Sequence, residues 1–466
     1  MLTRGRRRED DLQQGPAGPG GGAIAVARGG ATSLAFRVLQ GLADFLVLFV
    51  TARGFGADGR GLYALTSVTA GFAIIPLAGI TVPITADLAH ARVTLGRLHA
   101  AAVWIALGGG ALTAGVLACA AVLERSRWTF LPYAAALTPF LLLAVIQQDL
   151  YRALGEIRRM SYLYLGLSLA TLAAFAAVAA SAPGRIHLAL AAWVAAVALV
   201  ALVTLRLQQR RLGFSPHRLG CLVRDVLRRG LPVSLANGLA QLNYRVDVFV
   251  VAVMLPLTQV GRYSVAIAMG EALWQVSRAA VTGAYAPIIG VSNRDSAALT
   301  LRTYRHVLLL LLAGALVGGV AARLFATSIF GAGFKGVWLP LALLLPGIVA
   351  RGAAEVLQPF LLVRLERTSD WLKASTIGMI LNLVLAVALV PSLGLAGAAL
   401  STTVSYLVGS VYLGHRFRAM APSVGIGGFM PGFDEVRDYR RIGELVFRSA
   451  RPADPNERGR DADTFE

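Results

Sequence analysis

Four arginines interrupt apolar stretches that are long enough to cross a lipid bilayer. They are Arg37, Arg245, Arg278 and Arg351. A charged side chain at the centre of a spanning helix costs about 2.5–3.5 kcal/mol, so such residues normally face a polar interior. Arginine suits a phosphate or diphosphate, because its planar guanidinium donates two parallel hydrogen bonds and stays charged at neutral pH. The four arginines therefore predict a basic cavity inside a membrane bundle, built to bind an anion.

Other polar residues recur on the same helical faces, three, four or seven positions from an arginine. Those predicted to line the cavity are Asn237, Gln241 and Gln275. The carboxylates that could couple transport to an ion or proton are Asp44, Asp247, Glu271 and Glu355. A second interpretation is that these charges only pair with one another and hold the bundle together. For Arg351 and Glu355 the two interpretations are equally well supported.

The composition places the chain among membrane proteins. Of its 466 residues, 56% are hydrophobic and 15% are charged, and the mean hydropathy is +0.65. This balance excludes an ordinary soluble domain. The net charge of +19 does not indicate nucleic-acid binding, because the arginines are distributed between apolar spans rather than gathered on one soluble domain. We predict an all-α polytopic membrane protein.

A spanning helix needs about 20 mostly apolar residues. About twelve segments meet this criterion, and they are 30–52, 62–86, 100–123, 130–147, 162–180, 188–205, 231–255, 263–289, 307–327, 337–363, 374–390 and 395–415. Counted over the tails and connections, Lys and Arg number 32 on the side of the termini and 7 on the other. Because cytosolic loops are enriched in these residues, both termini are predicted to be cytosolic.

The predicted spans fall into two halves. The expected organisation is a disordered basic tail (1–29), a six-span lobe (30–205), an amphipathic linker on the cytosolic surface (206–230), a second six-span lobe (231–415) and a polar tail (416–466). Asp44 followed by Gly61-Leu62-Tyr63-Ala64 in the first half corresponds to Asp247 followed by Gly261-Arg262-Tyr263-Ser264 in the second. Such internal similarity is typical of duplicated transporters, whose central cavity lies between the lobes.

Motifs for covalent, metal or nucleotide chemistry are missing from the sequence. It contains no G-x-x-x-x-G-K-[ST], G-x-S-x-G, H-E-x-x-H or C-x-x-C. The segment Gly54 to Gly59 matches G-x-G-x-x-G, but it lies between two predicted spans instead of in the βαβ unit that a dinucleotide site requires. We therefore expect a protein that is not an enzyme and that needs no cofactor or metal.

The segment from Ala52 to Leu65, ARGFGADGRGLYAL, resembles the first loop of bacterial polysaccharide flippases. These exporters of O-antigen and exopolysaccharide lipid carriers belong to the multidrug/oligosaccharidyl-lipid/polysaccharide (MOP) superfamily. Weaker similarity continues at 229–232, 260–266 and 394–401. The resemblance implies two six-helix lobes around a cavity, alternating access and an undecaprenyl-diphosphate-linked oligosaccharide as cargo. It also implies residence in the bacterial cytoplasmic membrane, in contact with its lipids and beside polymerase and glycosyltransferase machinery.

Two other classes of protein remain as alternatives. A multidrug or cation antiporter of the same superfamily would favour carboxylates over arginines in its cavity. A membrane glycosyltransferase or O-antigen ligase would usually carry a large extracytosolic loop, whereas no predicted connection on that side exceeds about fifteen residues. The lipid II flippases also resemble this chain but carry two further spans at the C-terminus, where this sequence is polar.

Overall fold

The computed structural model describes residues 19–89, 93–123, 128–217, 219–421, 426–432 and 437. Every regular element in these residues is a helix. The first lobe consists of α2 (Pro19–Ala78), α3 (Thr81–Ala89), α4 (Leu95–Leu123), α5 (Leu131–Ala153), α6 (Ile157–Ser181) and α7 (Ile186–Leu212). The second contains α8 (Leu219–Asn243), α9 (Val246–Met254), α10 (Leu257–Glu271), α11 (Trp274–Gly290), α12 (Asn293–Phe330), η1 (Ala332–Phe334), α13 (Trp338–Glu355), η2 (Pro359–Arg364), α14 (Thr368–Leu393), α15 (Leu395–Met420) and η3 (Ile426–Phe429).

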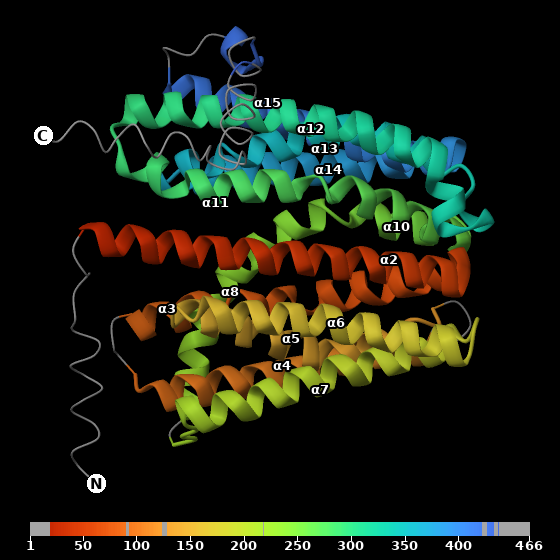
Figure 1. The fold of residues 1–466 in the computed structure, drawn as a ribbon. Helices are drawn as coiled ribbons and strands as arrows, with labels where there is room; N and C mark the ends of the chain where they lie inside the picture. Colours follow the sequence, from red (N-terminus) through yellow and green to blue (C-terminus); the bar gives the residue numbers. More distant parts are fainter. Residues whose placement is uncertain are drawn as a thin grey trace, which may run out of the picture.

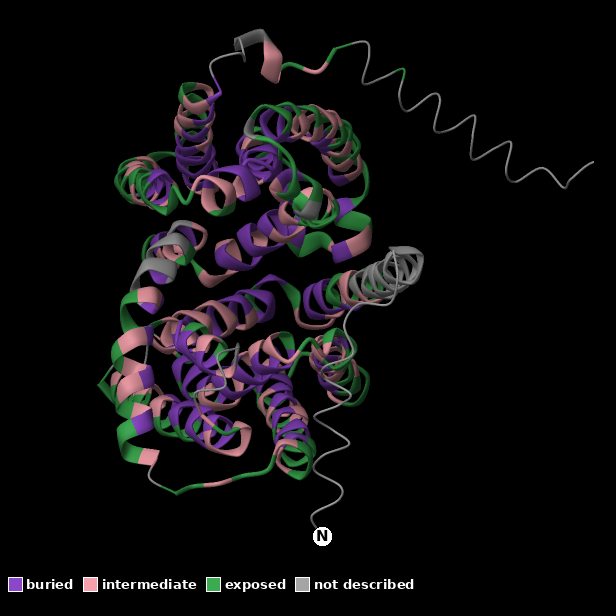
Figure 2. Ribbon diagram, turned by 90° about the vertical axis from the view of Figure 1, so that its left-hand side faces the viewer, coloured by how far each residue is buried: buried purple, intermediate pink, exposed green. Residues whose placement is uncertain are grey.

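The two lobes lie one above the other, with their helix axes roughly parallel (Figure 1). Seen along the helices, they form two bundles whose buried residues face inward (Figure 2). We call the end of the molecule at which α15 stops at Met420 the inner end. The opposite end, at which α2 bends at Gly56, is the outer end.

The twelve predicted spans are confirmed, although several are not single helices. Nine stretches among the described residues are long and apolar enough to cross a membrane. The first of them holds two predicted spans, which meet at Gly56 within α2. Gly56 has φ of 69°, a conformation that glycine adopts without the steric penalty of a side chain. The seventh predicted span is divided between α8 and α9, and the eighth is divided between α10 and α11.

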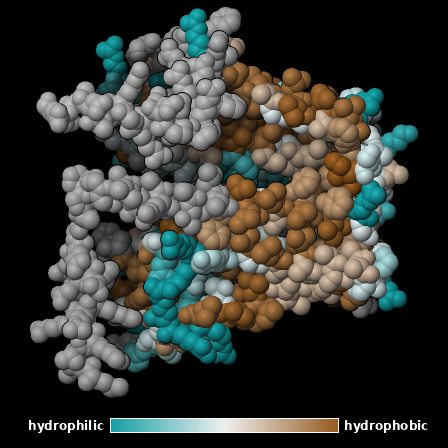
Figure 3. Space-filling model, viewed as in Figure 1, coloured by the Kyte–Doolittle hydropathy of each residue, from teal (hydrophilic) through white to brown (hydrophobic). Residues whose placement is uncertain are grey.

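The outer surface of the bundle is suited to lipid. Leu112, Leu316 and Val411 each leave 70% or more of their surface exposed. Hydrophobic side chains form a broad belt over both lobes, with hydrophilic residues at the outer end (Figure 3). Such a belt in an aqueous protein would be an aggregation-prone surface, whereas hydrocarbon solvates it at no cost. The chain is therefore a multi-pass membrane protein.

The segment predicted as a surface linker is mostly part of longer helices. α7 continues to Leu212, and α8 begins at Leu219 and crosses the predicted boundary at Gly230 without a break. The apolar face of α8 does not lie on a membrane surface, because Leu222 and Val226 are buried in a core cluster with first-lobe residues. An amphipathic helix can pack its apolar face against another part of the protein as well as against a membrane surface, so the sequence pattern alone does not distinguish the two.

The chain ends also differ from the predicted tails. α2 already begins at Pro19, eleven residues before the predicted first span. At the other end α15 reaches Met420, and Phe429 of η3 packs against Tyr304 and Phe417 at centroid distances of 5.3 and 5.9 Å. Residues 1–18 and most of 433–466 lie outside the described residues.

The lobes touch each other at both ends of the bundle. At the outer end α2 crosses α10 so closely that a Cβ on Gly61 would lie 2.6 Å from the Leu257 carbonyl oxygen. A Cβ on Gly261 would overlap the Ala57 carbonyl oxygen. These are the two corresponding glycines of the internal repeat. At the inner end Arg229 of α8 forms a two-bond ion pair with Asp87 of α3, at 3.0 and 2.6 Å.

Candidate functional site

Three adjoining cavities, of about 870, 580 and 460 Å³, lie where the two lobes face each other. The first two share Arg60, Tyr63 and Glu271, and the last two share Asp44 and Arg278. The first-lobe walls come from α2, α3, α5, α6 and α7, and the second-lobe walls come from α8, α9, α10 and α11. We refer to the three together as the central cavity.

The central cavity is lined by four basic and three acidic side chains, giving a formal excess of one positive charge. The basic residues are Arg60, Arg152, Arg245 and Arg278, and the acidic ones are Asp44, Asp149 and Glu271. Because the charges nearly balance, the free-energy cost of holding them at membrane depth is small. The arginines can still donate hydrogen bonds to an anion.

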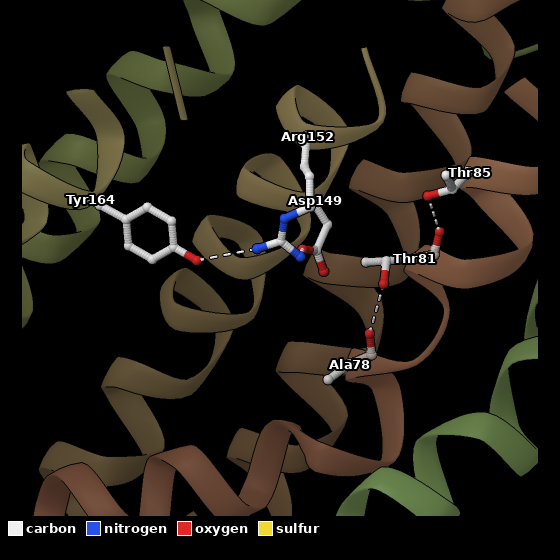
Figure 4. Close-up of polar contacts among 6 residues, drawn as sticks. All are labelled: Ala78, Thr81, Thr85, Asp149, Arg152 and Tyr164. Atoms are coloured by element: carbon white, nitrogen blue, oxygen red, sulfur yellow. Dashed lines mark hydrogen bonds and ion pairs between the residues drawn. The ribbon is translucent and has the colours of Figure 1, made fainter. Parts of the chain in front are cut away.

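Two of the arginines are paired with carboxylates. Arg245, immediately before α9, lies 2.8 Å from Glu271 at the end of α10. Arg152 lies 2.7 Å from Asp149 one helical turn earlier, and its other terminal nitrogen is 3.5 Å from the Tyr164 hydroxyl. Figure 4 shows the Arg152 guanidinium between these two groups, with Thr81 beyond Asp149.

The other two cavity arginines have no carboxylate partner among the described residues. Arg60 donates to two hydroxyl groups, those of Ser264 and Thr51. Arg278 is exposed in the inner part of the cavity, beside Gln275. Asp44 lines the same part and accepts a hydrogen bond from Ser168 at 2.8 Å. The unpaired arginines are therefore the ones best placed to take up an added negative charge.

Helix breaks coincide with the charged residues of the second lobe. Arg245 precedes the first residue of α9, Glu271 is the last residue of α10, and Glu355 is the last of α13. A helix end leaves backbone N–H or C=O groups without an intrahelical partner, which at membrane depth is tolerated only next to protein or a polar cavity. Broken helices are also how transporters build their binding sites.

The structure brings together six of the residues that the sequence predicted for the site. Those lining the central cavity are Asp44, Gln241, Arg245, Glu271, Gln275 and Arg278. Arg37 and Asn237 belong to helices of the structure, but their side chains lie outside the described residues.

Three predicted site residues are not among the lining residues. Arg351 is 4% exposed and donates from Nε to the Tyr244 hydroxyl at 3.1 Å, with the Trp371 ring 4.8 Å from its guanidinium carbon. It therefore lies behind Tyr244, which does line the cavity. Glu355 is half-buried, and no described ion pair joins it to Arg351, so the predicted intrahelical pair is not formed.

Asp247 is the third, and it is buried within the second lobe at 1% exposure. It accepts hydrogen bonds from the hydroxyls of Tyr263 and Thr402, the latter at 2.8 Å, and from the backbone N–H of Val248 at 2.9 Å. Three donors from three helices satisfy a carboxylate that has no basic partner within ion-pair distance in the described part of the chain.

Sequence reasoning missed Arg60 and Arg152 as cavity residues, because it assigned both to connections between spans. α2 and α5 in fact carry them inside helices. A helical signal was present in each case. The signal is a spacing of three residues, which puts Arg60 on one helical face with Tyr63 and Arg152 on one face with Asp149. Both pairs are in contact in the structure, with the Tyr63 ring centroid 4.9 Å from the Arg60 guanidinium carbon and Asp149 paired with Arg152.

Comparison with solved structures identifies the fold. The lipid II flippase MurJ, in an inward closed conformation, matches with a TM-score of 0.67 and 13% identity over 90% of this chain and 94% of its own. An inward-facing multidrug resistance MATE family transporter of the MOP superfamily matches with a TM-score of 0.56 and 16% identity, covering 83% and 96%. The eukaryotic MATE transporter AtDTX14 matches with 0.52 and 14%, covering 85% and 98%.

These likenesses establish that the chain has the two-lobe, twelve-helix fold of MOP-superfamily transporters, as the sequence predicted. No family model and no curated protein matches it in sequence.

Proposed function

We propose that this protein is a flippase that moves an undecaprenyl-diphosphate-linked oligosaccharide across the bacterial cytoplasmic membrane for surface polysaccharide biosynthesis. The observation that carries the proposal is the central cavity with its four arginines, two of which have no carboxylate partner in the described residues. A diphosphate carries negative charge on oxygens that fit the donor geometry of a guanidinium. The MOP fold and the resemblance of residues 52–65 to polysaccharide flippases support the same cargo.

Alternating access is the proposed mechanism. The lobes meet at the outer end through Gly61 and Gly261 and at the inner end through Arg229 and Asp87. Opening one contact while the other is closed would expose the central cavity to each side of the membrane in turn. The 32-to-7 distribution of Lys and Arg supports a cytosolic inner end, with both termini there, and hence entry of cargo from the cytosol.

Energy for this cycle would come from an ion gradient or the membrane potential, since the sequence lacks an ATP-binding motif. The coupling carboxylates we propose are Asp44, Asp247, Glu271 and Glu355. Of these, Asp247 is the most deeply buried, at 1% exposure. Protonation would remove the cost of burying its charge and change its hydrogen bonds to α10 and α15.

A cation antiporter is the second candidate, favoured by the likeness to MATE transporters and by Asp44, which has no basic partner in the described residues. Its cavity would bind organic cations, and the excess of arginine would then repel the cargo. The two functions differ in the sign of the cargo, which a transport assay can determine directly.

Translocation by purified protein in liposomes tests the proposal. Lipid-linked diphosphate oligosaccharide should cross without ATP, and a cationic dye should not be expelled. Arg278→Ala should lower translocation about tenfold or more, because a hydrogen bond to a charged group contributes about 1.5–3 kcal/mol. Arg278→Lys keeps the charge but loses the two-bond geometry, so part of the activity should remain. The matched control is Arg323→Ala, at an exposed site on α12.

Arg245 requires a second comparison because it is paired with Glu271. If the pair only holds the bundle together, Arg245→Ala should lower membrane abundance, and Arg245→Ala with Glu271→Ala should restore both abundance and transport. A cargo-binding Arg245 predicts that the double variant is abundant but inactive. Normal translocation by both Arg245→Ala and Arg278→Ala would contradict the proposed site, and expulsion of the dye would favour the antiporter.

A further inference from the structure

Arg60 is the most confined of the cavity arginines. It is 7% exposed, and it lies on α2 four residues beyond the bend at Gly56, at the outer end of the central cavity. Its Nε donates to the Ser264 hydroxyl at 3.1 Å, and its Nη1 donates to the Thr51 hydroxyl at 3.0 Å. The Tyr63 ring lies against its guanidinium, 4.9 Å from centroid to Cζ. The side chain is thus held in one orientation by both lobes.

These partners leave the positive charge without a counter-ion. Two hydroxyls and an aromatic ring stabilise a guanidinium less than a carboxylate does, and none of the described acidic residues forms an ion pair with Arg60. Its Nη2 makes no hydrogen bond to a described residue and is not a buried atom. Arg60 lines both the 870 and the 580 Å³ cavities. The two N–H bonds of Nη2 are therefore open to the cavity interior.

We propose that Arg60 forms an outer anion site, which receives the phosphate group of the cargo at the exit end of the cavity. The outer anion site consists of Arg60 with Thr51, Tyr63 and Ser264, and it is separate from Arg278 and Arg152 at the inner end. This inference rests on the proposed function and adds a second binding position to it. A rigidly held fork with free donors binds a phosphate with little loss of conformational freedom.

The outer anion site also lies at the contact that must open for release. Gly61, next to Arg60, and Gly261, three residues before Ser264, form the crossing of α2 and α10. Separating the lobes there breaks the hydrogen bond between Arg60 and Ser264. A phosphate oxygen bound to the guanidinium would supply the lost acceptor, so cargo at this site lowers the cost of opening the outer end.

The competing explanation is that Arg60 only fastens the two lobes together. The two explanations make different predictions for the anchoring hydroxyls. If Arg60 only stabilises the contact between the lobes, replacing Thr51 and Ser264 should change the diphosphate affinity and the unfolding temperature as much as replacing Arg60 does. If Arg60 binds the cargo, removing the hydroxyls should weaken the lobe contact but leave the free edge of the guanidinium able to bind phosphate.

Binding of undecaprenyl diphosphate to the purified protein in nanodiscs tests the inference, with undecaprenyl monophosphate and uncharged undecaprenol as comparison lipids. Arg60→Gln should weaken diphosphate binding about tenfold or more, and Arg60→Lys should weaken it less. Thr51→Val with Ser264→Ala frees the Arg60 guanidinium from its two hydroxyl partners, so it should lower the unfolding temperature and weaken diphosphate binding less than Arg60→Gln does. Arg323→Gln is the control for the loss of an arginine far from the cavity: it removes a contact with the Trp338 ring at 5.2 Å but should leave the diphosphate affinity unchanged.

Unchanged diphosphate affinity in Arg60→Gln would overturn the inference, as would an equal loss in Arg60→Gln and in the double hydroxyl variant. If Arg60→Gln does not fold, Arg60→Lys decides, and wild-type affinity there overturns the outer anion site. An equal effect on the monophosphate and diphosphate lipids would define the site as one for a single phosphate. A wild-type protein that binds undecaprenol as tightly as undecaprenyl diphosphate would refute the proposed function itself, a result distinct from failure of the Arg60 variants alone.

Discussion

Asp44 with Tyr63 in the first half of the chain corresponds to Asp247 with Tyr263 in the second, but the two pairs have different surroundings. Asp44 and Tyr63 both line the central cavity, where Asp44 bonds to Ser168 and Tyr63 lies against Arg60. Tyr263 is fully buried and donates its hydroxyl to Asp247, which is equally enclosed. The first-half pair faces the cargo space, and the second-half pair is part of the lobe interior.

The difference arises from the neighbouring helices. α15 places Thr402 beside Asp247, and α14 places Asn382 within 3.4 Å of Thr402, so hydroxyl and amide groups surround this carboxylate. Beside Asp44 the corresponding space is open to the cavity, and Ser168 of α6 is its hydrogen-bond donor in the structure. Two similar local sequences can thus supply a cargo-facing carboxylate and a buried one, because the rest of each lobe differs.

The largest expected effect comes from removing the buried carboxylate. Asp247→Ala leaves the Tyr263 and Thr402 hydroxyls and the Val248 N–H without their acceptor. Each unsatisfied buried group costs about 1–3 kcal/mol, so we expect a large fall in unfolding temperature and in membrane abundance. Asp44→Ala, at the corresponding position, should leave both near wild type. Equal destabilisation by the two variants would contradict the comparison.

A second prediction concerns the corresponding glycines, Gly61 and Gly261. Gly261→Ala should hold the outer ends of the lobes apart, because its Cβ would overlap the Ala57 carbonyl oxygen. Asp58 and Thr258 form a hydrogen bond of 2.8 Å across this contact, so cysteines at both positions report closure by disulfide formation. The assay requires prior replacement of the two native cysteines, both of which are exposed.

Disulfide yield at the outer end should fall several-fold in Gly261→Ala. It should be unchanged in Gly318→Ala, where an added Cβ meets no atom within 4 Å. Gly61→Ala should have an intermediate effect, since its Cβ contacts the Leu257 carbonyl at 2.6 Å. Wild-type yield in Gly261→Ala would mean that the crossing adjusts and does not control closure.

The smallest expected effect is that of Asp44→Asn, which keeps the shape of the side chain and removes its charge. Ser168 can still donate to the remaining carbonyl oxygen, so stability should be unchanged. Translocation should change by a few-fold, because the charge balance of the cavity shifts towards positive. Liposome transport beside thermal unfolding measures both. A loss of stability without a change in transport would mean that Asp44, like Asp247, stabilises the interior of its lobe, and it would contradict the comparison.

Hydropathy and helical spacing predicted the twelve spans, the two halves and six of the cavity residues. These features are local, since they depend on how long an apolar run is and on which residues share one helical face. Of the residues predicted from the same information, Arg245, Gln241, Glu271 and Gln275 line the central cavity, because their helices border the lobe interface on the face that carries the polar residues.

Only the tertiary structure decided what each polar face meets. Arg351 shares a face with polar residues, yet Trp371 and Tyr244 from other helices enclose it. Arg60 appeared to belong to a loop, because the sequence does not reveal that α2 resumes directly after Gly56 and presents Arg60 to the second lobe. Spacing along one helix determines which side chains point together, whereas the neighbour on that side comes from another helix, as Tyr244 does for Arg351, 107 positions away, and Ser264 for Arg60, 204 positions away. Whether a polar side chain faces a cavity or a buried hydroxyl is therefore a property of the packed bundle.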